Sequence, residues 1–314
     1  MMEKEKFKDL FNQALVKDVF EEKIDIVLSG QYGKALELLH DAEATGLFPA
    51  LVGPPGVGKT ILCRYFASMR AKESQFSHSF HWLTMDESIK PSHFLGSFDP
   101  AITLNKGFVL DAFNPGPLLS AMLEGGTFLA NEINRATEYS QNTLLEPLEE
   151  ASISIPHLGR IKAHEDFFFI SAMNPEELSG THRLSEALKD RIKIWIKLTY
   201  PDKSTELDII RINLPEHFTI EESELELIYS IINETRKNKV DIEVPASIRA
   251  GIAMAKLLGR KRYLERENDV KEKESVYVHL SDIAIHVLLG SIKPKPGVKV
   301  QDIINRIIHK TLGA

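Results

Sequence analysis

Residues 53–60 carry the clearest chemical signal in this chain, because they read GPPGVGKT, a complete G-x-x-x-x-G-K-[ST] pattern. An apolar stretch, 47–52, precedes them, and residues 61–67 follow with helical spacing. This order of strand, glycine-rich loop and helix is typical of a phosphate site, since the glycines let backbone N–H groups curl around a phosphate and the helix N-terminus favours negative charge. The alternative, a glycine-rich turn with a chance lysine, leaves both flanks unexplained.

This loop predicts a site for a nucleoside triphosphate and Mg²⁺. Lys59 would reach the β- and γ-phosphates as a point charge, and the Thr60 hydroxyl would ligate the metal. The pattern itself does not separate ATP from GTP. The predicted cofactor-binding residues of the loop are Gly53, Pro54, Pro55, Gly56, Val57, Gly58, Lys59, Thr60 and Ile61.

A second signal lies at residues 127–132, TFLANE, a strand candidate that ends in a polar pair. In nucleotide hydrolases the tip of such a strand lies beside the phosphate loop, where it meets Mg²⁺ and the attacking water. Glu132 is predicted to polarise that water. Asn131 stands where an aspartate usually orients the metal, and an amide adds no negative charge. We therefore expect hydrolysis with a weakened hold on Mg²⁺, and a nucleotide-binding scaffold with little hydrolysis stays as an alternative.

The elements that must position these residues are short apolar strand candidates alternating with helical segments. This alternation predicts a mainly parallel sheet covered by helices, an α/β nucleotide-binding domain over residues 1–200. It includes an opening amphipathic helix marked by the helical spacing of Phe7, Leu10, Phe11 and Ala14. The strand candidates are 80–83, 127–130, 167–171 and 192–198.

From about Pro201 the pattern changes to helices alone. We expect a smaller, all-helical second domain over residues 201–314, with helices near 223–235, 246–258 and 281–289. The stretch 260–275 mixes both signs of charge and is interpreted as a solvated helix or loop with a structural role.

Composition narrows the class of protein. The 314 residues are 43% hydrophobic and 26% charged, which is ordinary for a globular protein. A net charge of −7 offers no general attraction to nucleic acid or to an anionic membrane. The single cysteine, Cys63, excludes an internal disulfide and fits a cytoplasmic setting. Neither an export signal nor a run of about 18 apolar residues is present, so no membrane association is expected.

Several ordered motifs together resemble the MoxR branch of the AAA+ ATPases. They are ANEINRA at 130–136, NTLLEPLEE at 142–150, ISAMNP at 170–175, GTH at 180–182 and LSEALKDR at 184–191. The match runs from about residue 20 to 258. The resemblance implies an AAA+ phosphate-loop sheet domain followed by a helical lid.

Two insertions fit that branch, whose members resemble the helix-2-insert group of AAA+ proteins. Residues 94–118 have alternating, glycine-punctuated halves that suit a hairpin interrupting a helix, and 153–167 suggest a second hairpin split at Gly159-Arg160. In ring-shaped relatives such hairpins face the pore or a partner, and the alternative is ordinary surface loops. Arg160 and Lys162 make the second tip too weakly basic for DNA binding.

The resemblance also assigns roles to residues outside the loop. Asn174 would align the attacking water and sense the γ-phosphate. Arg191 would be the finger that enters the neighbouring subunit's site, with Arg135 and Arg183 as rival candidates. Arg249 would contact the nucleotide from the lid.

The function implied is that of an ATP hydrolase forming a ring, expected to be a hexamer, that remodels or matures a client protein in a chaperone-like manner. A protein with a von Willebrand factor A domain is the partner that the family implies. A DNA-associated GTPase or motor of the methyl-directed restriction type is the rival, because Met173-Asn174-Pro175 also resembles that branch.

Overall fold

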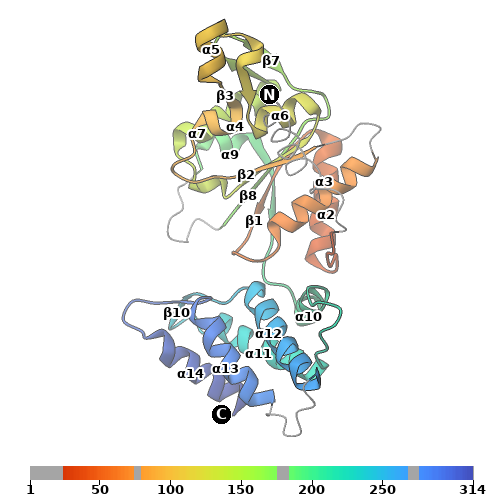
Figure 1. Cartoon of the computed structure of the whole chain (residues 1–314), viewed down its shortest axis with the longest axis vertical. Helices are drawn as coiled ribbons and strands as arrows, with labels where there is room; N and C mark the ends of the chain where they lie inside the picture. Colours follow the sequence, from red (N-terminus) through yellow and green to blue (C-terminus); the bar gives the residue numbers. More distant parts are fainter. Residues whose placement is uncertain (1–23, 74–78, 175–183, 268–275, 314) are drawn as a thin grey trace. The chain divides into compact units, whose positions relative to one another are not determined.

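The computed structural model describes residues 24–73, 79–174, 184–267 and 276–313. The expected N-terminal helix around Phe7, the segment 180–182 and the rival arginine Arg183 lie outside these residues. The chain forms two compact units (Figure 1). The first comprises, among the described residues, 31–54 and 58–198, and the second comprises 25–30, 55–57 and the chain from Thr199 onward.

The first unit is built on a five-stranded parallel sheet, as the sequence predicts. The strand order is β2-β5-β8-β1-β9, so neighbours in space are not neighbours in sequence. The strands are β1 (Phe48–Val52), β2 (Phe80–Thr84), β5 (Thr127–Asn131), β8 (Phe168–Met173) and β9 (Ile192–Lys197).

Burial along the strands explains why these segments form a sheet covered on both faces. Every residue of β8 is buried, whereas the edge strands are more accessible: in β2 only Phe80 is buried, and in β9 more and less accessible residues alternate. Successive side chains of β8 point to opposite faces. Phe168 packs 5.6 Å from Phe66 of helix α3 (Lys59–Glu73), and Phe169 joins a core that includes Leu118 of α6 (Pro117–Glu124).

The sheet aligns the ends of its strands at one edge. Val52 lies beside Met173, and Asn131 lies beside Ala172. The loops that follow β1, β5 and β8 therefore begin next to one another at the carboxyl ends of the strands. The other helices of this unit are α2 (Gln31–Thr45), α7 (Glu138–Thr143), α8 (Leu145–Glu150) and α9 (Glu186–Arg191).

Both expected insertions contain an antiparallel strand pair. The first runs through α4 (Pro91–Leu95), β3 (Gly96–Phe98), α5 (Pro100–Lys106), η1 (Leu110–Ala112) and β4 (Phe113–Pro115). The helical pieces between its strands were not predicted. The second pairs β6 (Ser152–Ile155) with β7 (Gly159–Lys162), so its turn precedes Gly159. The rings of Phe108 and His157 stack at 4.1 Å and join the two insertions.

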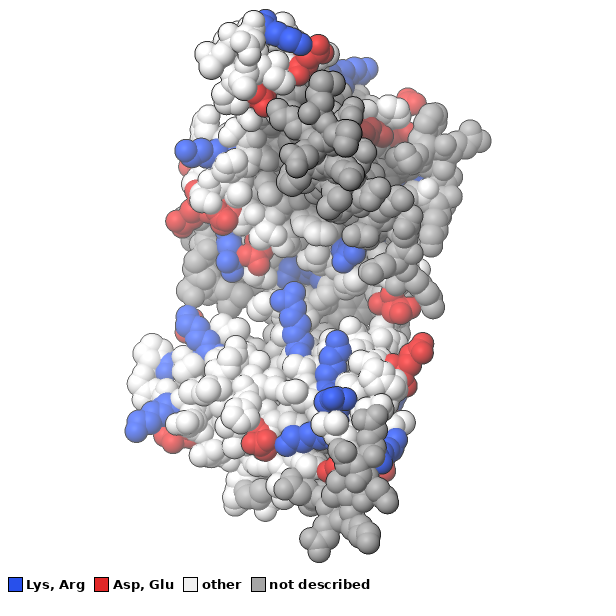
Figure 2. Space-filling model, in the orientation of Figure 1, with Lys and Arg blue, Asp and Glu red and all other residues white. Residues whose placement is uncertain are grey.

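The second unit is helical, as expected, apart from one short antiparallel pair, β10 (Ile242–Val244) with β11 (Lys293–Pro294). No helix among the residues described here is long and apolar enough to cross a membrane. On the face drawn in Figure 2, the coloured atoms of basic and acidic side chains are interspersed. The helices are α10 (Lys203–Ile212), α11 (Glu222–Lys237), α12 (Ile248–Glu267), α13 (Val276–Leu289) and α14 (Val300–Leu312).

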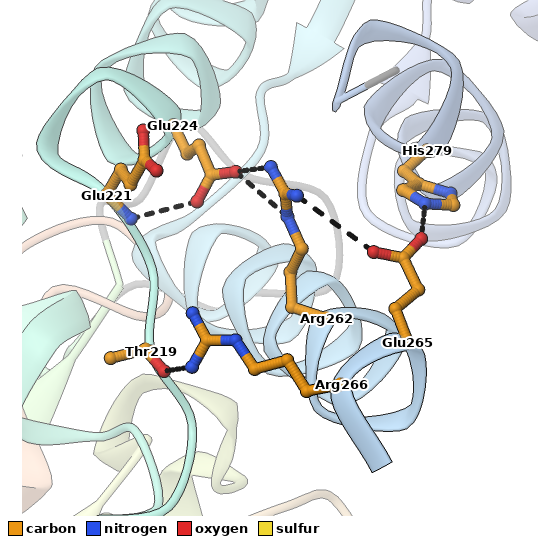
Figure 3. A network of polar contacts seen from close by, with 7 residues as sticks. All are labelled: Thr219, Glu221, Glu224, Arg262, Glu265, Arg266 and His279. Carbon is orange, nitrogen blue, oxygen red and sulfur yellow. Dashed lines mark hydrogen bonds and ion pairs between the residues drawn. The ribbon is translucent and has the colours of Figure 1, made fainter. Parts of the chain in front are cut away.

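The charged end of α12 has a structural role (Figure 3). Arg262 donates through Nη2 to Glu224 Oε1 of α11 at 2.5 Å, and Glu224 is only 3% exposed. Glu265 Oε1 lies 2.6 Å from Nε2 of His279, which belongs to α13. These contacts tie three helices together, which agrees with the structural interpretation of the charged stretch.

Candidate functional site

The Lys59 side chain is hydrogen-bonded to the backbone of the glycine-rich loop. Its side chain is largely buried, and Nζ donates to the carbonyls of Gly53 at 2.6 Å and Pro54 at 3.1 Å. It also donates to Asn174 Oδ1 at 2.9 Å. These three acceptors are neutral, and an anionic phosphate near Nζ would add charge complementarity.

The glycines of the loop are required by its backbone. Gly56 and Gly58 have φ of 76° and 89°, in the left-handed region that favours glycine. A Cβ on Gly53 would lie 2.4 Å from the carbonyl oxygen of Leu198. These constraints leave backbone N–H groups uncovered by side chains where a phosphate would bind.

Thr60 and Asn131, the predicted metal residues, lie side by side. Thr60 Oγ1 donates to Asn131 Oδ1 at 3.5 Å, and Asn131 Nδ2 donates to Thr84 Oγ1 at 3.2 Å. Hydroxyl and amide oxygens are ligands that Mg²⁺ accepts, so this pair fits the ion, with nucleotide phosphates supplying the negative charge that Asn131 lacks.

Glu132 follows directly in a strained backbone conformation. Its φ of 53° and ψ of 39° place a residue with a side chain in the left-handed region, at a cost of about 1–2 kcal/mol. Such outliers persist where the surroundings over-determine them, often at functional sites. Its carboxylate forms an ion pair with Arg135, whose Nε lies 2.6 Å from Oε2.

Asn134 connects this turn to Asn174, and no role for it was predicted from the sequence. It is fully buried, and its Nδ2 donates to the backbone carbonyl of Asn174 at 3.1 Å. Its Oδ1 is buried and has no hydrogen-bond partner among the residues that the structure describes. The only sequence signal was its place in the ANEINRA segment.

Arg191 is bonded to residues of α8 and α9, which do not include Lys59, Asn174 or Glu132. Nη2 donates to Glu149 Oε2 of α8 at 2.5 Å, Nη1 donates to the carbonyl of Ala187 at 3.2 Å, and Asp190 lies 3.8 Å away. The hydrogen bond to Glu149 raises the pKa of the Arg191 guanidinium. The structure therefore brings Lys59, Asn174 and the Glu132 turn together, and it places Arg191 against Glu149.

Arg249 belongs to the second unit and is exposed near the start of α12. It lines a pocket of about 300 Å³, whose residues all belong to that unit, together with Pro55, Pro245, Ser247 and Gly290. Pro55 is part of the glycine-rich loop. The predicted nucleotide contacts Arg249 and Pro55 thus line the same pocket.

Comparison with known proteins decides the family. Residues 50–192 match the model of the AAA domain of the dynein-related subfamily. The chain is 30% identical to the chaperone MoxR1 of Mycobacterium tuberculosis over 161 residues, which cover 51% of this chain and 38% of that protein. Residues 50–192 therefore form an AAA domain, and the chain is similar to the MoxR-like AAA+ ATPases.

Two further relatives match over more of the chain. The gas vesicle ATPase GvpN of Haloferax mediterranei is 27% identical over 258 residues, covering 77% of this chain and 67% of that protein. The uncharacterised protein YeaC of Bacillus subtilis is 23% identical over 278 residues, covering 81% of both. The MoxR-like chain is thus an ATP-binding ATP hydrolase, as predicted, and AAA+ ATPases generally assemble as rings.

Proposed function

We propose that this MoxR-like ATPase forms a ring, a hexamer, in the cytoplasm and couples ATP hydrolysis to chaperone-like remodelling or maturation of a client protein. The observation that carries the proposal is that Arg191 is bonded to Glu149, whereas the contacts described above for Lys59 and Asn174 do not involve Arg191. A neighbouring subunit would supply the arginine that this cluster needs.

The residues of one chain would then share the chemistry as follows. Glu132 polarises the attacking water, and Asn174 aligns it and senses the γ-phosphate. Lys59 stabilises the negative charge that develops on the phosphate. Residues 53–61 cradle the nucleotide, and Arg249 contacts it from the second unit.

A metal ion would complete the site. Thr60 and Asn131 would hold Mg²⁺, which neutralises phosphate charge when bound. Neither Thr60 nor Asn131 has a carboxylate, so the phosphates of the nucleotide would provide most of the electrostatic attraction for the ion.

Arg191 would act on the adjacent subunit. An arginine supplied from outside raises the rate of phosphoryl transfer by roughly 10³ to 10⁵. This corresponds to about 4–7 kcal/mol of barrier. Such a contact differs between the ATP and ADP states, so it would convert hydrolysis into subunit movement.

The client role is supported by the relative named a chaperone and by the two insertions. Exposed apolar residues of the first insertion, Leu104, Phe108 and Leu110, suit contact with a client or partner. The family resemblance supports a partner that carries a von Willebrand factor A domain.

Steady-state ATP hydrolysis measured against protein concentration tests the ring. Specific activity should rise with concentration in the wild type and fall by about 10³-fold or more in Arg191→Ala. Lys189→Ala, on the same helix, is the matched control and should retain activity. A rate that is independent of concentration and unaffected by Arg191→Ala would contradict the proposal.

A further inference from the structure

The turn after β5 places two charged side chains at its ends. It is the 3₁₀ turn η2 (Ile133–Arg135), and Glu132 precedes it. We propose that Arg135 is a positioning residue that acts within its own chain on the Glu132 carboxylate, and that it is not the finger offered to the neighbour. This inference rests on the proposed function, in which Glu132 polarises the attacking water.

The turn is rigid, which is the first support. The backbone N–H of Arg135 donates to the carbonyl of Glu132 at 2.8 Å, and that of Ala136 donates to Ile133 at 3.2 Å. Ile133 and Asn134 are fully buried, and Asn134 is bonded to the carbonyl of Asn174. Because the middle of the turn is anchored, its two ends keep their relative positions.

Charge is the second support. Arg135 Nε lies 2.6 Å from Glu132 Oε2, although the N–H does not point at that oxygen and makes no aligned hydrogen bond. The Arg135 side chain is 44% exposed and that of Glu132 is 27% exposed. A partly solvated pair of this kind adds little to stability. Its consequence is directional, because a cation carried by the anchored turn beside the carboxylate favours one orientation of that carboxylate.

The third support is the different surroundings of the rival arginine. Arg191 belongs to α9, and its partner Glu149 belongs to α8. Neither residue is part of the turn. The two arginines therefore serve different carboxylates, of which only Glu132 stands beside the metal residue Asn131.

Substitution of Arg135 separates orientation from binding. Arg135→Gln should lower kcat for ATP by about 100-fold. The KM should stay within about twofold, because the phosphate contacts of Lys59 are unchanged. Arg135→Lys keeps the positive charge and should recover part of the loss. The denaturation midpoint of Arg135→Gln, compared with that of the wild type, verifies that the variant is folded. An unchanged kcat in the folded variant would overturn the proposal.

Mixing inactive variants separates action within a chain from action across subunits. Arg135→Gln mixed in equal amounts with Glu132→Gln should stay inactive, because no chain then carries both residues. If Arg135 acted on the neighbour, about a quarter of the interfaces would regain an intact pair. Such recovery would overturn the proposal. Co-purification of differently tagged subunits verifies that the rings mix.

A parallel mixture keeps the two proposals distinguishable. Glu132→Gln with Arg191→Ala should recover about a quarter of the sites if Arg191 acts in the neighbour. Failure of this mixture alone would count against the proposed trans role of Arg191. Arg135 would still be supported by lost kcat with retained KM and no recovery in its own mixture.

Discussion

Lys59 and Asn174 lie 115 positions apart in the chain and meet through a hydrogen bond of 2.9 Å between Nζ and Oδ1. The contact joins the phosphate loop to the end of β8. Because Asn174 also accepts from Asn134 through its backbone carbonyl, hydrogen bonds connect the loop, the end of β8 and the turn after β5. A shift at the phosphate would therefore be transmitted to the Glu132 turn.

Asn134→Ala should impair catalysis without removing any nucleotide contact. The lost bond to Asn174 frees the end of β8, so we expect kcat to fall about tenfold with little change in the KM for ATP. Stability should fall by about 1 kcal/mol, the usual contribution of one hydrogen bond. Steady-state kinetics and urea unfolding measure both effects. Asn105→Ala, an exposed asparagine of α5, is the control, and equal kcat in the two variants would refute the connection.

Glu149→Ala should weaken the action on the adjacent subunit that we propose for Arg191. Without Glu149 the Arg191 guanidinium loses the acceptor that lies 2.5 Å from it. Ordering the side chain for its contact with the adjacent subunit then costs conformational entropy. We expect specific ATPase activity at saturating protein to fall about tenfold, less than in Arg191→Ala. Glu150→Ala, which removes the exposed partner of Arg160, should leave activity near that of the wild type. A loss of equal size in both variants would point to damage of α8 instead.

Asn131→Asp should tighten the hold on Mg²⁺. The new carboxylate would lie beside Thr60, where the present amide contributes no charge. We expect the Mg²⁺ concentration for half-maximal hydrolysis to fall about tenfold, a change of roughly 1.4 kcal/mol. Asn114→Asp adds the same charge on β4 and should leave this value unchanged. An unaltered Mg²⁺ requirement in Asn131→Asp would remove Asn131 from the metal site.

Arg262→Ala should destabilise the second unit. Glu224 would remain buried without its cation, which typically costs about 3–5 kcal/mol. Arg266→Ala removes a neighbouring arginine bonded to Thr219 on the exposed surface and should cost less than about 1 kcal/mol (Figure 3). Denaturant unfolding compares the two. Similar losses of unfolding free energy in the two variants would show that the buried ion pair contributes no more to stability than the exposed hydrogen bond.

Local pattern was sufficient for the elements that bear the site. The glycines and lysine of residues 53–60 define a phosphate loop by spacing alone, and the buried runs of β5 and β8 were found from their apolar residues. Strand ends shifted by one or two residues, as at β8, which begins at Phe168 instead of Phe167 and extends to Met173. The helical pieces of the first insertion were missed because seven-residue helices such as α5 carry too few turns for a period to show.

The sequence by itself determined the phosphate loop, the polar pair at the end of β5, the parallel sheet and the helical character of the second unit, since each depends on residues close together in the chain. Only the tertiary structure decided that Asn134 reaches Asn174, that Arg135 faces Glu132 and that Arg191 is bonded to Glu149. Two of these contacts join residues about 40 positions apart, and the third depends on the left-handed backbone at Glu132. Periodicity reports which side of an element is buried and carries no information about which element lies against it.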